Sequence, residues 1–375
     1  MTTFSSFELS KHERISWIFG AGASATTPYK VPIQSKMLKK FFDANYPGRP
    51  GRKALIDDLK TTTKNICNEV LPGVKEDSSE LILEEVFSAY EIILEERRST
   101  RAERQKAEDA LHTLREAIRL STYVHGRGDA RKWRPHDRKN EKSPYAELIE
   151  KLYAKGVPEG PKNAFVTFNY DICLDRCLIN LRNEIDIDLD YGIVLANSRT
   201  VGAPQFSNPR QSKSTLLLRT HGGLNWLRCE ACQSIFTTVN KHATVKETDT
   251  CWACGSSRLE FVFVHPSYIR KYDDPIIQLV WGRCQEELVL SDAWVFVGYS
   301  LPAADVHFRA LIRHCLKKRD EKGLDTSIYI VGRKQSNGDH ISDSLAKNYQ
   351  SIFNGREKIW ESTEGGFSDF VGCVS

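Results

Sequence analysis

Four short apolar runs in this chain are each followed directly by glycine or polar residues. The runs are rich in branched and aromatic side chains and lie at Ile15–Phe19, Ala164–Val166, Leu216–Leu218 and Trp294–Val297. Apolar runs of this length are typical of strands buried on both faces, as in a parallel sheet. Helical patterns separate them, and a fifth strand pattern follows at Ser327–Val331. The alternation predicts an α/β fold with a doubly wound, Rossmann-like parallel sheet.

The residues that follow these runs predict a binding site. The segments are Gly20-Ala21-Gly22-Ala23-Ser24, Thr167-Phe168-Asn169-Tyr170-Asp171, His221-Gly222-Gly223 and Gly298-Tyr299-Ser300-Leu301, and Gly332-Arg333 follows the fifth strand in the same way. Open α/β sheets bind ligands at the carboxyl ends of their strands. We therefore expect these segments to form one composite nucleotide site.

The first two segments each allow two interpretations. Gly20 and Gly22 permit a tight turn and a close approach to a pyrophosphate, and Ser24 adds a hydroxyl donor. Glycines between a strand and a helix more often serve only to make the turn. Asn169 can bind a ribose hydroxyl or hold a water, and Asp171 can accept from an amide or a hydroxyl. Alternatively, both cap the helix that follows them.

The other strand ends add a base and further polar groups. His221 can act as a general base toward a ribose hydroxyl or an attacking water. A core histidine with satisfied hydrogen bonds is the alternative. The backbone of Gly298 and the hydroxyl of Ser300 can meet phosphate or ribose, whereas Asp305 can cap the next helix.

Two pairs of cysteines have the spacing of a zinc ribbon. They are Cys229-Glu230-Ala231-Cys232 and Cys251-Trp252-Ala253-Cys254, with 18 residues between the pairs. Each CxxC turn brings two sulfurs to one ion, and Zn²⁺ takes four ligands in a tetrahedron. Because thiolates fill all four positions, we expect a structural ion. The first pair begins eight residues after His221, so the ribbon is expected to brace the loop of that histidine.

A segment without nucleotide motifs separates the first two strands. Apolar residues recur at helical spacing in Leu81–Leu94 and Leu111–Ile118, and a helix is also expected from Ile33 to Phe42. The predicted order is a first part of the Rossmann-like domain at 1–46, a helical insertion at 47–141, a continuation at 142–228, the zinc ribbon at 229–258 and a C-terminal part at 259–375.

Composition points to an ordinary globular protein. Hydrophobic residues make up 40% and charged residues 27% of the 375 residues. No apolar stretch approaches the roughly 18 residues that span a bilayer, and the polar Met1–Arg14 does not resemble a signal peptide. The six cysteines outside the two pairs are scattered, which favours buried thiols in a reducing compartment. We expect a cytoplasmic protein with no membrane partner.

The net charge of +4 equals the excess of basic over acidic residues in one segment. Residues 127–142 hold seven Lys or Arg against three acids, with Trp133 among them. Such a segment can touch nucleic acid or an acidic partner, although a solvated loop is the simpler interpretation and nucleic acid is not expected.

The order of the motifs resembles the sirtuin superfamily of NAD-consuming enzymes. GAGxS, TxNxD, HG, the two CxxC pairs and GxSL follow one another from Ile15 to Val331. Segments 264–271 and 297–305 are similar to a divergent prokaryotic branch associated with anti-phage defence. The resemblance implies a sirtuin-type fold that binds NAD as substrate, with a retained structural zinc. It assigns Gly20, Ala21, Gly22 and Ser24 to the pyrophosphate and ribose, Asn169 and Asp171 to the nicotinamide ribose, His221 to catalysis, and Gly298, Ser300 and Arg333 to the adenosine.

Two departures from deacylating sirtuins shape the expected reaction. The Gly-Ile-Pro-Asp-Phe-Arg stretch is replaced by Lys30-Val31-Pro32-Ile33-Gln34-Ser35, and the peptide-binding Phe-Gly-Glu segment by Val264-His265-Pro266. The resemblance therefore implies an NAD⁺ glycohydrolase that acts in anti-phage defence by depleting NAD⁺, restrained by a regulatory protein partner or a homo-oligomer. An NAD-dependent protein deacylase and a non-catalytic NAD or ADP-ribose sensor are the alternatives.

Overall fold

The computed structural model of the chain falls into two compact units. It describes residues 2–25, 29–44, 50–73, 82–122, 143–153, 162–185, 188–195, 214–237, 250–251, 253–303, 305–332, 343–360 and 366–375. The sheet unit comprises Met1–Lys30, His125–Phe263 and Asp273–Ser375, and the helical unit comprises Val31–Val124 and Val264–Tyr272. The basic segment 127–142 and Arg333 lie outside the described residues.

The sheet unit is built on an eight-stranded parallel sheet. Its order is β1 (Thr2–Phe4), β11 (Glu357–Trp360), β10 (Ser327–Val331), β9 (Ala293–Val297), β2 (Arg14–Phe19), β3 (Lys162–Thr167), β5 (Ser214–Arg219) and β4 (Asp188–Asp190). The five strands expected from the sequence are confirmed and occupy adjacent places in this order. The additional strands, β1, β4 and β11, are three or four residues long and lie toward the two edges.

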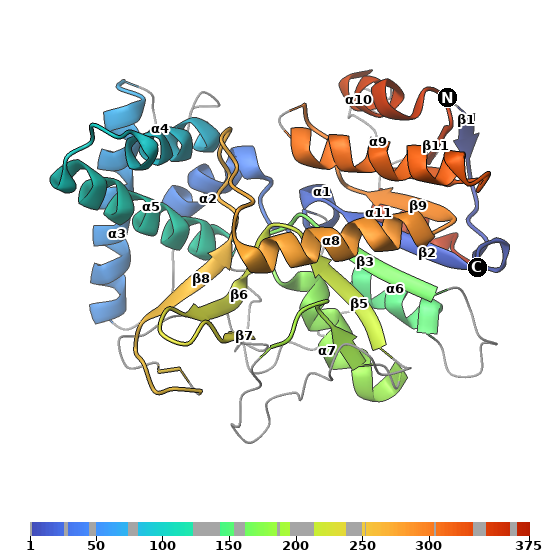
Figure 1. Cartoon of the computed structure of the whole chain (residues 1–375), viewed down its shortest axis with the longest axis horizontal. Helices are drawn as coiled ribbons and strands as arrows, with labels where there is room; N and C mark the ends of the chain where they lie inside the picture. The colour runs from blue at the N-terminus through green and yellow to red at the C-terminus, as the bar shows by residue number, and fades with distance from the viewer. Residues whose placement is uncertain are drawn as a thin grey trace. The chain divides into compact units, whose positions relative to one another are not determined.

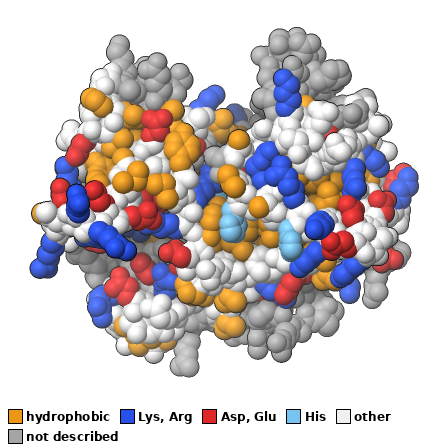
Figure 2. Space-filling model, turned by 45° about the horizontal axis from the view of Figure 1, so that its top comes forward, with side chains coloured by type: hydrophobic (Ala, Val, Ile, Leu, Met, Phe, Trp, Pro, Cys, Tyr) orange, Lys and Arg blue, Asp and Glu red, His pale blue; other side chains and the backbone are white. Residues whose placement is uncertain are grey.

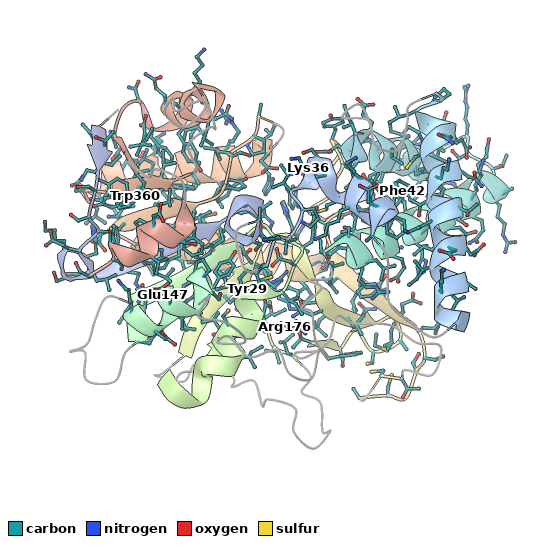
Figure 3. The ribbon with its side chains drawn as sticks, turned by 180° about the vertical axis from the view of Figure 1, so that it is seen from behind. Tyr29, Lys36, Phe42, Glu147, Arg176 and Trp360 are labelled. Atoms are coloured by element: carbon teal, nitrogen blue, oxygen red, sulfur yellow. The ribbon has the colours of Figure 1, made fainter. Side chains whose placement is uncertain are left out.

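Helices cover both faces of this sheet. One face carries α8 (Pro275–Leu290), α9 (Val306–Glu321) and α10 (Asp343–Phe353), and Figure 1 shows α8 and α9 in front of the strands. Seen from behind, the other face carries α6 (Pro144–Tyr153), α7 (Cys173–Ile185) and α11 (Phe367–Gly372) (Figure 3). The chain winds from β2 toward β3 but from β9 toward β10, although β2 and β9 are neighbours. The direction of winding therefore reverses between β2 and β9, which is where open α/β sheets bind ligands.

Aromatic rings fill the layer behind the sheet. Phe19 on β2 meets the ring of Tyr145 edge-on, with 5.2 Å between centroids, and Tyr145 meets Phe367 of α11 at 5.3 Å. Near the sheet edge, Trp360 packs against Phe4 at 5.3 Å (Figure 3). Edge-to-face pairs of this kind add stability beyond their buried area.

A second, antiparallel sheet follows β5 directly. β6 (Gly222–Cys229) pairs with β7 (Ile235–Thr237) on one side and β8 (Leu259–Phe263) on the other. Leu227 and Phe236 form its small core. These three strands were not predicted from the sequence. β6 ends at Cys229, the first cysteine of the first pair.

The helical unit contains α2 (Met37–Asp43), α3 (Pro50–Val70), α4 (Leu83–Glu95) and α5 (Arg101–Ser121). Both expected amphipathic helices are confirmed as α4 and α5, whereas the helix expected from Ile33 begins at Met37 after a 3-10 turn. A capping box of Thr100 and Glu103 starts α5. Because α2 contacts α5, the unit begins at Val31, earlier than the insertion at 47–141.

The surface mixes charges of both signs. Acidic and basic side chains are interspersed on the face shown in Figure 2, with hydrophobic side chains between them. Within the described ranges, no helix is long and apolar enough to cross a membrane.

Candidate functional site

The four strand ends with glycine or polar residues lie side by side. β9, β2, β3 and β5 are consecutive in the sheet and all parallel, so their carboxyl ends share one edge. This is the arrangement expected for a composite site at the point where the winding reverses.

The glycines of the first and last segments pack against one another. The amide of Gly22 donates to the carbonyl of Gly298 at 2.8 Å, and the amide of Gly20 donates to Val297 at 3.0 Å. A Cβ at Gly20 or Gly22 would lie 2.7 Å from the Gly298 carbonyl oxygen. These glycines therefore let two loops meet across β2 and β9, a use that neither sequence interpretation named.

Gly298→Ala is expected to destabilise the sheet unit by about 3 kcal/mol. Gly298 has φ +60°, and a Cβ there would lie 2.2 Å from the amide nitrogen of Ala23. Gly282→Ala on α8 is the matched control, because a Cβ there meets no heavy atom of the described residues within 4 Å. We expect that control to stabilise by up to about 1 kcal/mol. Urea denaturation measures both, and equal midpoints would contradict the contact.

The Asn169 side chain is fixed by hydrogen bonds just after β3, and its carbonyl oxygen makes none with the described residues. Its side chain is buried, and Nδ2 donates to the carbonyl of Gly20 at 3.0 Å and to Ser24 Oγ at 3.2 Å. Since a carbonyl can only accept, the atom that faces Gly20 must be the nitrogen, which fixes the amide's orientation. Its Oδ1 is buried and has no hydrogen-bond partner among the described residues. Asn169 therefore presents an open acceptor and does not cap α7.

Asp171 does cap the following helix. Its Oδ1 accepts from the amide of Cys173, the first residue of α7, at 2.9 Å. The same oxygen accepts from Ser24 Oγ at 3.2 Å, and the hydroxyl of Tyr145 lies 3.0 Å from Ser24 Oγ. The four side chains of Ser24, Tyr145, Asn169 and Asp171 thus form one buried network. Burial raises the pKa of Asp171 above its usual range, and Tyr145 has its pKa raised well above the ordinary value for the same reason.

The raised pKa of Asp171 predicts a pH dependence of stability. Because the folded protein favours the protonated carboxyl, the stability that this group contributes is full below pH 3.8, the ordinary value, and is lost as the pH rises through the folded pKa. Asp171→Asn keeps the acceptor for Cys173 and removes this titration. Relative to wild type, the variant should therefore gain in free energy of unfolding as the pH rises from about 4 to 7. Parallel urea-denaturation curves over that range would contradict this expectation.

A second buried tyrosine, Tyr29, links the segment before α6 to α7. Tyr29, labelled in Figure 3, hydrogen-bonds to Ser143, just before α6, and its hydroxyl lies 2.9 Å from Cys177 Sγ on α7. Burial raises the pKa of Cys177 to about 11, so this thiol stays protonated at neutral pH. The buried thiol therefore has little of the thiolate character that a nucleophile needs.

His221 lies in the turn between β5 and β6, with only 4% of its surface exposed. Its imidazole ring and the ring of Phe168 meet edge-to-face at 5.2 Å between centroids, and Tyr170 stacks on the imidazole at 6.1 Å. Trp281 fixes the preceding residue, because its Nε1 donates to the carbonyl of Thr220 at 2.9 Å. These contacts place His221 beside the segment that carries Asn169.

The remaining candidates have more varied positions. Ser300 is exposed, and its carbonyl accepts from Nδ2 of Asn348 at 3.1 Å. Ala21 is half-buried at the start of α1 (Ala21–Ser24). Asp305 does not cap α9 with its side chain, and its carboxylate accepts from the hydroxyl of Tyr299.

Two residues of the site were missed from the sequence. Tyr145 joins the Ser24 network, and nothing in its helical surroundings marks it. Arg219 ends the apolar run of β5 and is fully buried, with its guanidinium bound to the carbonyls of Asn169 and Asp171. A charged residue at the end of a buried strand was the available signal, because lone charges are rarely buried.

The four cysteines of the two pairs form one cluster. The sulfurs of Cys229, Cys232, Cys251 and Cys254 all lie within 4.8 Å of one another. The sulfurs of Cys229 and Cys254 are 3.6 Å apart, and those of Cys232 and Cys251 are 3.5 Å apart. A tetrahedral ion with Zn–S bonds of about 2.3 Å requires sulfurs about 3.8 Å apart. The donor set and its spacing therefore fit a structural zinc ion.

The two cysteine turns have the same backbone geometry. Gln233 and Gly255 follow the second cysteine of each pair, have positive φ of 60° and 77°, and donate their amides to the carbonyls of Cys229 and Cys251. Hydrogen bonding with Ser234 lowers the pKa of Cys232 to about 6, which favours the thiolate that a metal binds. β6 runs from the residue after His221 to Cys229, so one strand links the cluster to the histidine.

Comparisons with known proteins give a distant similarity. Neither a family model nor a curated protein sequence matches the chain. A Sir2 homologue in complex with NAD is similar at 14% identity and a TM-score of 0.40, over 97% of this chain and 90% of that chain. A structure described for the mechanism and regulation of Sir2 enzymes is similar at 15% identity and a TM-score of 0.39, over 97% and 92%.

Proposed function

We propose that this chain is an NAD⁺ glycohydrolase that cleaves NAD⁺ to nicotinamide and ADP-ribose. The single observation that carries the proposal is the open Oδ1 of Asn169, buried at the carboxyl edge of the sheet with its amide oriented by Gly20 and Ser24. The order of motifs that resembles sirtuins supplies the substrate, since that family consumes NAD. The protein is then expected to take NAD⁺ as substrate and Zn²⁺ as a structural ion.

A buried acceptor without a donor is costly. Leaving such a group unsatisfied costs about 1–3 kcal/mol, which a bound hydroxyl or water would recover. A ribose hydroxyl or the attacking water can donate to Asn169 Oδ1. The oriented amide is therefore suited to positioning one of these groups without any rearrangement of its own bonds.

The proposed reaction breaks one bond and forms one. The glycosidic bond between C1′ of the ribose and N1 of nicotinamide breaks, and its electron pair neutralises the pyridinium nitrogen. A water oxygen forms the new bond to C1′ and loses one proton. Because the transition state resembles an oxocarbenium ion, the site has mainly to hold the ribose rigidly and orient the water.

His221 is proposed to take that proton or to bind a ribose hydroxyl. It lies one strand away from Asn169 in the sheet, since β3 and β5 are adjacent, and its ring meets the side chains on both sides of Asn169. Asp171 is proposed to hold Ser24 and the start of α7 in place. Gly20, Ala21, Gly22, Gly298, Ser300 and Arg333 are proposed to contact the rest of the dinucleotide.

A deacylase is the second candidate, and the zinc cluster favours it. Deacylating sirtuins share the ribbon that the four cysteines are expected to form, whereas Val264-His265-Pro266 replaces their peptide-binding segment. Incubation with NAD⁺, with and without an acetyl-lysine peptide, followed by mass analysis of the products, separates the candidates. We expect nicotinamide and ADP-ribose in equal amounts without peptide. Acetyl transfer in proportion to NAD⁺ loss would indicate a deacylase, and tight NAD⁺ binding without products would indicate a sensor.

The cellular role is proposed to be anti-phage defence by NAD⁺ depletion. Such an activity must be restrained in resting cells, and a regulatory partner or oligomer that acts through the helical unit would provide the restraint. Cells that carry the chain should lose NAD⁺ only after infection. An isolated chain whose rate of NAD⁺ hydrolysis does not change when the partner is added or the oligomer forms would count against this restraint.

A further inference from the structure

Arg219 is a fully buried arginine that contacts two functional segments at once. It is the last residue of β5, and its Nε donates to the carbonyl of Gly222 at 3.1 Å. On the other side of the guanidinium, NH2 donates to the carbonyls of Asn169 at 2.9 Å and Asp171 at 2.8 Å. One planar group thus joins the Asn169 segment to the turn that carries His221.

Asp175 balances and orients this guanidinium. It lies in the first turn of α7 and pairs with NH1 of Arg219, and both side chains are only 1% exposed. The other carboxylate oxygen accepts from the hydroxyl of Tyr191 at 2.7 Å and from Nδ2 of Asn225 at 3.3 Å. The guanidinium therefore has a fixed position and cannot rotate away from the three carbonyls without breaking a buried ion pair.

The surrounding sequence accommodates this arrangement. A Cβ at Gly223 would lie 2.5 Å from Nε of Arg219, so the second glycine after His221 leaves room for the guanidinium. Arginine is suited to this place because its planar group presents five donors in fixed directions. A lysine carries a single ammonium and cannot reach carbonyls on two segments in this fashion.

We propose that Arg219 and Asp175 are positioning residues that set Asn169 and His221 relative to each other for the reaction at C1′ of the nicotinamide ribose. The inference rests on the proposed glycohydrolase function. Neither residue touches the substrate; Arg219 acts through the backbone of 169–171 and of Gly222. A shift of about 1 Å between the two segments is expected to lower the rate by about 10²-fold.

The test compares conservative variants with a matched buried arginine. Arg219→Lys is expected to lower kcat for nicotinamide release about 10²-fold, and Asp175→Asn about 10-fold, while KM and the Kd for ADP-ribose by calorimetry change less than about threefold. Arg319→Lys is the control. Arg319 is also buried, but it binds Thr326 and the carbonyl of Val289. Thr326 directly precedes β10, so this contact lies at the amino ends of the strands and not at the carboxyl ends that form the site. It should lower the unfolding temperature and leave kcat unchanged.

The possible results separate the positioning role of Arg219 and Asp175 from the proposed glycohydrolase function. Folded Arg219→Lys and Asp175→Asn proteins with wild-type kcat would overturn the positioning role and leave the glycohydrolase intact. An equal fall of kcat in Arg319→Lys would also overturn it, because general destabilisation would then explain the loss. A wild-type chain that releases no nicotinamide would overturn the proposed function together with this role.

Discussion

Asn169→Ala is expected to lower nicotinamide release from NAD⁺ by a factor of about 10²–10³, the loss seen when one oriented polar group is removed from an active site. The variant deletes the open Oδ1 and the Nδ2 that binds Gly20 and Ser24. His221→Ala is expected to cause a loss of about 10²–10⁴, as for a general base. Initial rates of nicotinamide formation measure both effects.

Asn163→Ala is the control for the Asn169 variant. Asn169 follows the carboxyl end of β3, whereas Asn163 lies within β3 near its amino end, where its Oδ1 accepts from Nε1 of Trp17 at 2.8 Å. Loss of this bond should cost about 1 kcal/mol of stability and leave the rate unchanged. If Asn169→Ala and His221→Ala both turned over NAD⁺ like wild type, the assignment of the site would be wrong.

Removal of the bound metal is expected to unfold the three-stranded sheet and abolish nicotinamide release. Structural zinc sites contribute about 10–16 kcal/mol of apparent binding free energy that folding depends on. Because β6 runs from Gly222 to Cys229, its loss would free the turn of His221. Chelation, followed by circular dichroism, metal analysis and the nicotinamide assay, measures the three effects together.

Cys229→Ser should reproduce the effect of chelation. Cys373→Ser is the matched control, since Cys373 is exposed and lies outside the cluster. We expect one zinc ion per chain in the control and a loss of bound zinc in Cys229→Ser. Full activity in a metal-free protein would refute the proposed link between the cluster and His221.

The sequence predicts the centre of the sheet better than its edges. β2, β9 and β10 are buried runs of five or six residues and match the expected positions closely. β4 and β1 are three residues long and contain polar side chains, so periodicity alone does not distinguish them from loops. Their strand structure depends on neighbours that are far away in the chain.

The site residues show the same limit. The sequence offers helix capping and ligand binding equally for Asn169 and Asp171, and the structure separates them: Asp171 caps α7, whereas Asn169 turns toward Gly20. That difference depends on β2 lying beside β3. The pairing of Arg219 with Asp175 joins residues 44 positions apart and carries no local signal.

The four strand ends are proposed to form one NAD site around Asn169. A crystal structure of the protein with bound ADP-ribose tests it most directly. We expect the nucleotide along the carboxyl ends of β9, β2, β3 and β5, with a ribose hydroxyl or a bound water about 2.6–3.2 Å from Asn169 Oδ1. ADP-ribose bound elsewhere, with Asn169 Oδ1 still unpaired, would contradict it.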